Sequence, residues 1–367
     1  MQATMTCVGL DVDARSTHAA AIDVTTGELR RVRFGAGTEE VVSWLAGLEA
    51  PVRAVYEAGP TGFGLARLAR AVGIEMLVAA PSKTPRAKGD RVKSDRKDAE
   101  LLARLLLAGQ LKPVVIPPDW LEAIRHLART REQVRRDLGR ARQRVSKLLL
   151  VEGRVYPGNT TWNAEHRRWL SRQQFQFECT GLAFIDLLAA VDGLSARRQA
   201  LDQRLSRLAT DERLWPSVSR LRAFRGVDTL TALALHLELG GDWQRFSSPR
   251  RLSSWLGLVP SLDQSGEGLT QGSITKTGSS IARRLLVEAA WHYLRPPRIG
   301  ATLKNRQSGQ SDHILQIAWR AQHRLYRTTS ASRHAASPPT SPRSQSPESS
   351  SDSSGPRQPL HDLTADR

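Results

Sequence analysis

The chain has 367 residues, and its 54 Lys and Arg against 36 Asp and Glu give a formal net charge of +18 at pH 7. This excess favours a polyanionic partner, most commonly nucleic acid and secondly an anionic membrane surface. Two cysteines exclude a disulfide framework or a zinc ribbon, and without an apolar run of ~18 residues or a signal peptide we expect an intracellular protein outside the membrane.

The first third of the chain alternates strand and helix signals. Amphipathic helices are predicted over 38–48 and 63–72, and strands over 7–12, 17–24, 29–34, 52–57 and 74–79. Three strands followed by α/β crossovers are typical of the mixed sheet of ribonuclease-H-like folds. We therefore predict an α/β domain over 1–118.

Long helices are predicted over 119–212. Apolar residues at heptad spacing indicate one helix of a coiled coil, and they are Leu127, Val134, Leu138, Ala141, Val145 and Leu148. After a break near 153–163, a second helix could return as the partner, with Leu194, Leu201, Leu205 and Leu208. Arginines lie between them, and for Arg131, Arg135 and Arg142 we weigh nucleic-acid contact against a solvated helix face.

The remaining chain divides into a small, mainly helical domain over 213–327 and a tail. Residues 221–239 read as helix, turn, helix around 226–228, which resembles a helix-hairpin-helix. The composition over 328–367 becomes Ser, Pro and Arg, and such a segment buries too little apolar surface to order itself.

Four acidic residues stand where the predicted sheet would bring them together. Asp11 and Glu57 end the first and fourth strands, and Asp95 and Asp98 begin a helix three residues apart. Clustered carboxylates repel one another, and Mg²⁺ removes that repulsion and can act in phosphoryl displacement. The ordinary alternatives are a turn cap, a salt bridge and acids favoured at a helix N-terminus.

A basic loop precedes the second pair of acids, and it contains Lys83, Arg86, Lys88, Arg91 and Lys93. A cationic loop leading to carboxylates resembles a channel for phosphate, and the alternative is a solvated charge run.

The segment 253–278 is dense in Gly and Ser, and small residues let a backbone approach phosphate closely. We predict that Ser265 presents its hydroxyl on a loop and that Lys276, with Arg283 just beyond, binds phosphate. Serine needs activation to act as a nucleophile, and the alternative is a glycine-rich surface turn.

These segments resemble the motifs of IS110-family transposases. The acidic motifs are VGLDV at 8–12, YEAGPTG at 56–62 and KSDRKDA at 93–99. The motifs of the serine segment are WLGLVP at 255–260, the Ser265-Gly266 pair and GSITKTG at 272–278. The resemblance implies a DEDD tetrad of Asp11, Glu57, Asp95 and Asp98 holding Mg²⁺ on a RuvC-like fold. It also implies Ser265 as the nucleophile, with Ser261 and Ser273 as fallback candidates.

The resemblance further implies cutting and rejoining of DNA at element ends and target by a dimer or tetramer. A structured guide RNA encoded by the element would read sequence by base pairing. We expect a cytoplasmic bacterial protein associated with the nucleoid.

Three alternatives stay open. An actin-like kinase fits the opening segment, although that fold places Gly where this chain has Asp13. A RuvC-like endonuclease would cut branched DNA without serine chemistry. A nucleic-acid-binding protein without catalysis would tolerate loss of Asp11 and Glu57.

Overall fold

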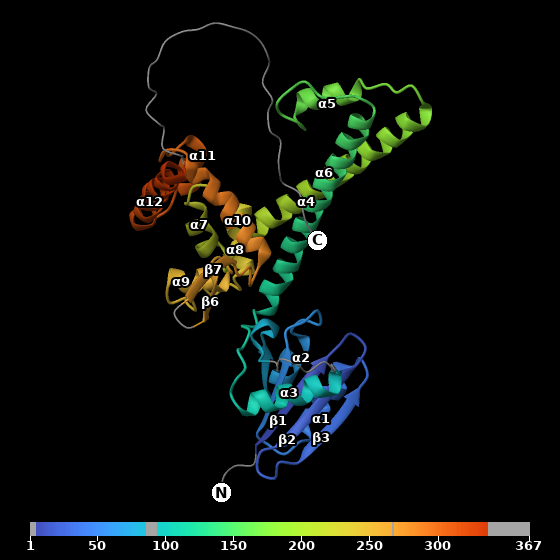
Figure 1. Ribbon diagram of the computed structural model, residues 1–367, viewed down its shortest axis with the longest axis vertical. Coiled ribbons are helices and arrows are strands. Elements are labelled where there is room, and N and C mark those ends of the chain that lie inside the picture. The colour runs from blue at the N-terminus through green and yellow to red at the C-terminus, as the bar shows by residue number, and fades with distance from the viewer. Residues whose placement is uncertain (1–4, 86–93, 266–267, 337–367) are drawn as a thin grey trace.

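The computed structural model describes residues 5–85, 94–265 and 268–336 (Figure 1). Its first part is built on a five-stranded sheet of order β3-β2-β1-β4-β5. The strands are β1 (Thr6–Val12), β2 (Thr17–Asp23), β3 (Leu29–Phe34), β4 (Val52–Glu57) and β5 (Glu75–Ala79). β1, β2 and β3 pair antiparallel, whereas β1, β4 and β5 pair parallel. The mixed sheet is therefore as the sequence predicts, and the structure adds the order of its strands.

Helices cover both faces of this sheet. On one face, α1 (Thr38–Ala46) and α2 (Gly64–Ala71) pack on Val8, Leu10 and Tyr56. On the other, α3 (Asp95–Leu107) packs its leucines on Cys7, Val55 and Ala79. Because side chains alternate along a strand, the odd-numbered residues at the end of β1 face α3.

α3 crosses β1 at very short range, and Gly9 makes this possible. A Cβ at position 9 would lie 2.0 Å from the Ala99 carbonyl oxygen and 2.4 Å from the Ala103 nitrogen. Both are backbone atoms, so a larger residue would displace the helix. The close crossing holds the first turn of α3 beside the end of β1.

Two long helices form an antiparallel hairpin, α4 (Asp119–Val151) and α6 (Glu178–Leu208), capped by the short helix α5 (Ala164–Ser171). In the distal half, Leu138 and Val145 of α4 meet Phe184 and Val191 of α6. In the proximal half, α4 packs on the C-terminal body through Leu121, which shares a cluster with Leu205. The predicted helices are present, but their apolar positions divide between two cores and do not form one continuous seam.

α6 contains a long apolar stretch that the sequence analysis did not single out. By length and composition it could cross a membrane, and 11% of its most apolar window is buried. Asp186 and Asp192 interrupt that window, and Asp192 pairs with Arg167. A single such helix is a weak indication of a membrane span, and its packing on α4 accounts for it as half of a hairpin.

The C-terminal body is mainly helical. Its elements are α7 (Trp215–Arg222), α8 (Thr229–Glu238), α9 (Pro249–Trp255), β6 (Pro260–Ser265), β7 (Gly268–Ile274), α10 (Ser280–Trp291), η2 (His292–Leu294), α11 (Ala301–Gln307) and α12 (Asp312–Ala336). Gly226 has φ +81°, and a Cβ there would lie 2.6 Å from the Ala289 carbonyl oxygen. The turn between α7 and α8 is thus packed tightly on the end of α10.

Two local predictions for this body are wrong. The serine segment is not simply a loop, because 260–265 and 268–274 pair as an antiparallel hairpin. The boundary at 328 is also misplaced, since α12 continues to Ala336. Beyond 328 the helix still packs on η2, where the Thr329 hydroxyl donates to the Tyr293 carbonyl at 3.3 Å. Residues 337–367 lie outside the described part.

A polar network joins α4 to the C-terminal body. Arg129 donates to both carboxylate oxygens of buried Glu238, at 2.8 and 3.0 Å, and the Ser279 hydroxyl donates to the same group at 2.6 Å. One turn further along α4, Glu132 is 4% exposed and accepts from Arg284 at 2.8 Å. Buried charges need such partners, so these contacts fix the body against α4.

Candidate active site

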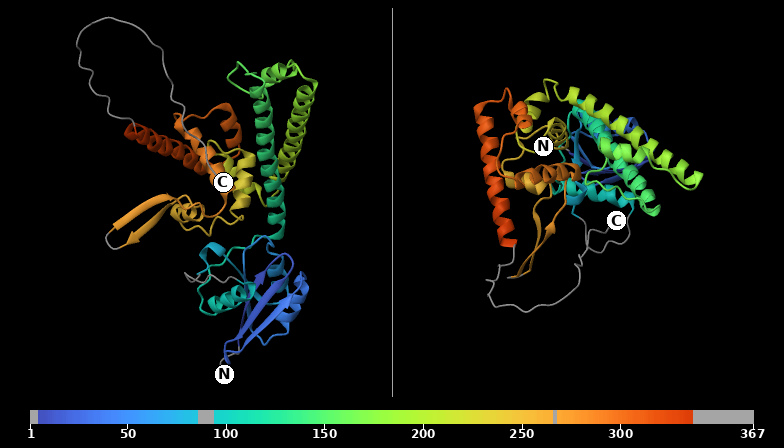
Figure 2. Two further views of the ribbon diagram at one scale, coloured as in Figure 1. Left: turned by 45° about the vertical axis from the view of Figure 1, so that its right-hand side comes forward. Right: turned by 90° about the horizontal axis from the view of Figure 1, so that it is seen from above.

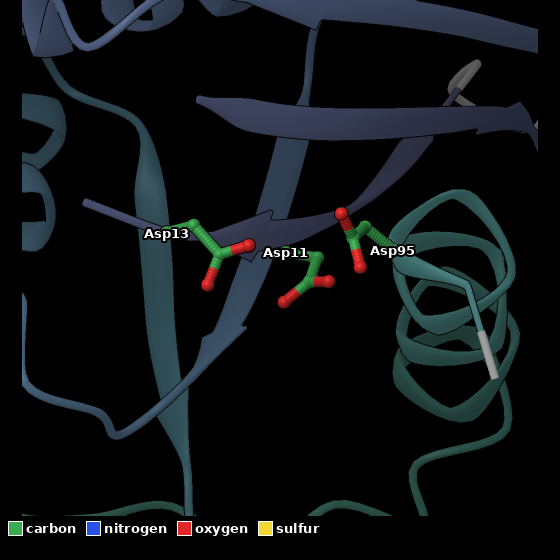
Figure 3. Close-up of side chains that lie close together, drawn as sticks. All are labelled: Asp11, Asp13 and Asp95. Atoms are coloured by element: carbon green, nitrogen blue, oxygen red, sulfur yellow. The ribbon is translucent and has the colours of Figure 1, made fainter. Parts of the chain in front are cut away.

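Three carboxylates converge at the end of β1. Asp11, Asp13 and Asp95 each offer one oxygen, and these oxygens all lie within 4.8 Å of one another. Figure 3 shows Asp11 and Asp13 coming from β1 and the residues just after it, and Asp95 from the start of α3. Oxygen donors gathered in this way are the ligands that hard divalent cations prefer.

Local structure fixes these side chains. Asp11 is half-buried near the end of a strand whose preceding residues form the core. Ser94 caps α3 by accepting a hydrogen bond from the Lys97 nitrogen, so that Asp95 begins the helix. The crossing at Gly9 then holds Asp95 over Asp11.

Glu57 and Asp98 lie beside this cluster without belonging to it. Glu57 ends β4, which runs parallel to β1 with Leu10 opposite Tyr56, and it shares the α3 side of the sheet with Val55. Asp98 is half-buried in the first turn of α3. Of the four predicted ligands, the structure brings Asp11 and Asp95 within 4.8 Å and adds Asp13.

Electrostatics at Asp11 reflect this crowding. Burial, and then repulsion from Asp13, Asp95 and Asp98, raise the pKa of Asp11 from 3.8 to about 6, opposed by His18. A raised carboxyl pKa means that the charged form is unfavourable in the folded protein. A bound cation would reverse this, so the residues present fit a divalent metal.

Sequence reasoning missed Asp13 and His18. Asp13 stands two residues after Asp11, and that spacing near a strand end was the available signal. His18 sits on β2 directly opposite Asp11, and its Nδ1 lies 4.0 Å from a carboxylate oxygen of Asp95. Only the strand register brings it there, so no sequence pattern indicated it.

The predicted basic channel can be followed only at its start. Lys83 ends the short helix η1 (Pro81–Lys83) and is exposed. Arg86, Lys88, Arg91 and Lys93 lie outside the described residues. Their role remains a prediction.

The three α4 arginines that we weighed for nucleic-acid contact have partners within the chain. Arg131 donates to Asp202 at 2.6 Å and Arg135 to Glu132 at 2.8 Å. The Arg142 guanidinium lies 5.1 Å from the ring centre of Trp162, and burial lowers its pKa. The Arg131 contact joins α4 to α6, the Arg135 contact lies within α4, and the Arg142 contact joins α4 to the segment before α5.

The β6–β7 hairpin carries the candidate serine. Ser265 ends β6, and its backbone pairs with Gly268. Lys276 is exposed with φ 54° and lies two residues after β7. Arg283 donates to the carbonyls of Leu256, Thr277 and Gly278 and so clamps the base of the hairpin.

Within one chain, the serine and the carboxylates belong to different bodies. Figure 2 shows the hairpin extending from the C-terminal body, away from α4 and α6, while the sheet domain lies beyond the start of α4. The two strands pack mainly against each other. A site using both elements must therefore combine separate parts of the molecule or of an assembly.

Comparison with known proteins identifies both bodies. Residues 8–152 match a transposase family named for its DEDD residues and IS110, and residues 218–299 match the family described as Transposase IS116/IS110/IS902. The first match, together with the carboxylate cluster, indicates divalent metal use.

Whole-length relatives agree. A putative transposase y4qE of Sinorhizobium fredii is 40% identical over 334 residues, covering 88% of this chain and 82% of the relative. The transposase for insertion sequence element IS1533 of Leptospira borgpetersenii is 30% identical over 327 residues, covering 87% and 94%. The chain therefore belongs to the IS110 family, as a DNA-processing transposase of an insertion sequence.

Proposed function

We propose that this transposase cleaves and rejoins DNA strands with Mg²⁺ held by the acidic site and with Ser265 as the nucleophile. The observation that carries the metal site is the approach of Asp11, Asp13 and Asp95 oxygens to within 4.8 Å. Glu57, at the end of β4, and Asp98, in the first turn of α3, complete the ligand set. An all-oxygen donor set of this kind suits Mg²⁺.

When bound, the metal would neutralise charge on the scissile phosphate and polarise its oxygens. The chain's own task is to gather and orient the carboxylates, since their crowding disfavours the ionised form of Asp11 until a cation is bound. β1 fixes Asp11 and the α3 cap fixes Asp95, so both are positioned before substrate arrives. Such preorganisation reduces the reorganisation needed in the transition state.

Ser265 supplies the covalent step. Its Oγ attacks phosphorus, an Oγ–P bond forms, and the bond from phosphorus to one deoxyribose oxygen breaks. The proton lost by the serine appears on the departing deoxyribose hydroxyl, so the step is balanced without another reactant. Because the phosphoserine ester conserves the bond energy of the phosphodiester, a strand hydroxyl can later reverse the step without ATP.

The separation of the bodies supports an assembly in which one chain's Ser265 serves another chain's carboxylates. We further propose a homodimer or tetramer, guidance by an element-encoded RNA, and action at the nucleoid in the cytoplasm. These features follow from family resemblance. Lys276 and the basic residues from Lys83 to Lys93 are proposed contacts to nucleic acid.

A RuvC-like endonuclease is the second candidate. It is favoured by one observation: the carboxylates converge within one chain, whereas the serine lies on a hairpin of another body. Water would then replace the serine as nucleophile, and no covalent adduct would form. Family membership leaves no need for the kinase alternative.

Trapping distinguishes the two. The full chain is incubated with Mg²⁺, DNA carrying the element ends and element-derived RNA, and adducts are mapped by mass spectrometry. We expect a DNA–peptide ester at Ser265 that is lost in Ser265→Ala and in Asp11→Ala. Ser261→Ala and Ser273→Ala are matched controls from the same hairpin and should retain the adduct.

Cleavage that persists in Ser265→Ala with no adduct would establish the endonuclease. An adduct mapping to Ser261 or Ser273 would overturn the assignment of Ser265 but keep the serine mechanism.

A further inference from the structure

An open pocket of about 510 Å³ lies in the C-terminal body, apart from both the carboxylates and the serine hairpin. One side is the turn between α7 and α8, and the other is the stretch from η2 to α11. Its polar side chains are mainly cationic, and they are Arg225, Asp228, His292, Arg298, Thr302 and Arg306.

The positive charge of this pocket is not matched by acids. Asp228 is the one carboxylate in its lining, and its Oδ1 accepts a hydrogen bond from the Thr231 nitrogen at 2.7 Å as the cap of α8. Within the part of the chain that the structure describes, none of the three arginines forms an ion pair. Three guanidinium groups therefore face one carboxylate.

Backbone carbonyls hold two of these arginines in place. Arg306 donates from one terminal nitrogen to the Val227 carbonyl at 2.7 Å, and Arg225 donates likewise to the Pro296 carbonyl at 2.7 Å. Each guanidinium has five N–H donors, so most remain for a ligand. Arg306 Nε is buried and has no hydrogen-bond partner within the described residues.

Burial also lowers the pKa of Arg306, with only partial support from Asp228. Arginine stays charged at neutral pH. The Arg306 guanidinium is therefore a charge that has lost part of its hydration without gaining an equivalent partner in the chain. An anion in the pocket would supply the missing compensation.

Several other partly buried arginines of the molecule have a charged or an aromatic partner within the chain. Arg129 pairs with Glu238, and Arg284 pairs with both Glu132 and Glu288. Arg142 and Arg245 have no acid partner, but their guanidinium groups lie over aromatic rings, Arg142 over Trp162 and Arg245 over Phe246 and Trp255. Within the described residues, Arg225, Arg298 and Arg306 have neither an ion pair nor a ring contact although they line one pocket, which points to a partner outside the chain.

We propose that this pocket binds a phosphate of the DNA backbone, with Arg225, Arg298 and Arg306 as its ligands. Guanidinium groups bind phosphate oxygens through paired, charge-assisted hydrogen bonds. The pocket is open to solvent, so a phosphate within a continuous strand can enter it. The assignment rests on the proposed action on DNA, and it gives the C-terminal body a fixed contact that orients the hairpin on the same body.

Binding without metal tests this separately from catalysis. The full chain is titrated against a labelled duplex DNA of mixed sequence in EDTA, at several salt concentrations. Arg298→Ala is the main variant because its side chain is exposed. We expect about tenfold weaker binding and a salt slope smaller by about 0.9, the value for one lost phosphate contact.

Arg213→Ala is the matched control, since Arg213 is exposed, lies in the same part of the chain and already pairs with Asp211 at 2.9 Å. Both variants lose one positive charge, so general attraction falls equally. Equal affinities and slopes for the two variants would overturn the proposal. If Arg298→Ala weakens binding as expected but the parent protein does not cleave DNA strands, the proposed mechanism is wrong and the proposed phosphate site is unaffected.

Two further arms identify the source of the phosphate. Duplex RNA of the same sequence should be less affected by Arg298→Ala than DNA is; a larger effect on RNA would overturn the DNA assignment. Inorganic phosphate should compete only weakly. The proposal would be contradicted if millimolar phosphate saturated the pocket and Arg298→Ala left the salt dependence of DNA binding unchanged. That result would identify a site for the free ion.

Discussion

The carboxylate cluster and the serine hairpin differ in how the fold holds them. Asp11 follows buried residues of a central strand, and Asp95 begins a helix that packs directly on that strand. Ser265 ends a strand whose main contact is its hairpin partner. The first element is fixed by the core of its domain, whereas the second is fixed only at its base.

That base is nevertheless tightly built. A Cβ at Gly257 would lie 2.2 Å from the Thr277 nitrogen, and one at Gly278 would lie 2.2 Å from the Trp255 carbonyl oxygen. Both glycines have positive φ, at 67° and 70°. The direction of the hairpin is thus set locally by these two close approaches. The comparison teaches that the core of one domain places the carboxylates, whereas the serine lies on a hairpin that its own chain holds mainly at the base.

The largest expected effect is on strand cleavage in Asp11→Asn. We expect cleavage to fall at least about a hundredfold, because even partners of metal ligands are worth 10–100-fold. Without metal, the same variant should unfold at a higher temperature than the parent, since it removes the repulsion that raises the Asp11 pKa. Cleavage assays and thermal melts in EDTA measure the two effects. Asp186→Asn, an exposed acid of α6, should change neither, and a destabilised Asp11→Asn protein would contradict the electrostatic account.

The same substitution placed in each region sharpens the contrast. Leu10 is fully buried, whereas Leu262 in the hairpin is 62% exposed. Leu10→Ala should lower the free energy of unfolding by about 2–5 kcal/mol, and Leu262→Ala by less than about 0.5 kcal/mol. Urea denaturation provides the measurement. A large loss at Leu262 would show that the hairpin belongs to the core of its own chain.

A glycine pair tests whether helix packing positions the acids. Gly9→Ala forces α3 away from β1, so we expect about 1–3 kcal/mol of destabilisation and weaker metal binding by calorimetry. Gly139→Ala is the control, because nothing lies within 4 Å of a Cβ there and the site is an exposed position of α4. That variant should gain about 0.5–1 kcal/mol. Unchanged metal affinity in Gly9→Ala would show that the close packing of α3 on β1 is not needed to position the carboxylates.

The smallest effect is a pH dependence. The folded pKa of Asp11 is about 6 against 3.8 for the ordinary group, so the folded state binds more protons between these values. Stability of the metal-free protein should therefore fall as pH rises from about 4 to 6, by about 1–2 kcal/mol after allowance for solvent screening. Melts across this range should show the slope in the parent and lose it in Asp11→Asn. Added Mg²⁺ should oppose the fall in stability. If the Asp11 contribution made stability rise with pH over this window, the pKa of Asp11 would be lowered in the folded protein and not raised.

Much of the sheet domain was predictable from short-range patterns. Apolar runs gave the five strands within a residue or two, and their order with the helices gave the mixed sheet. The acids were predictable because strand ends and helix starts are recognisable in sequence. Asp13 and His18 were not recognised, since their place depends on register and on the turn after β1.

Long-range contacts explain what the patterns could not indicate. Arg131 and Arg135 looked available for nucleic acid, yet each pairs with an acid, Arg131 with Asp202 on another helix. The arginines of the pocket at 225–306 attracted no notice in sequence because they are spread over about eighty positions. Whether a cation is paired or available is a property of neighbours in space.

The sequence by itself determined the element types of the sheet domain, the family motifs and the acids at strand and helix ends, because periodicity and spacing are local properties of the chain. Only the tertiary structure decided which carboxylates meet, which arginines are neutralised, and that the serine hairpin stands apart from the acids of its own chain. The physical reason is that repulsion, ion pairing and burial depend on distances between residues remote in sequence, and folding alone sets those distances.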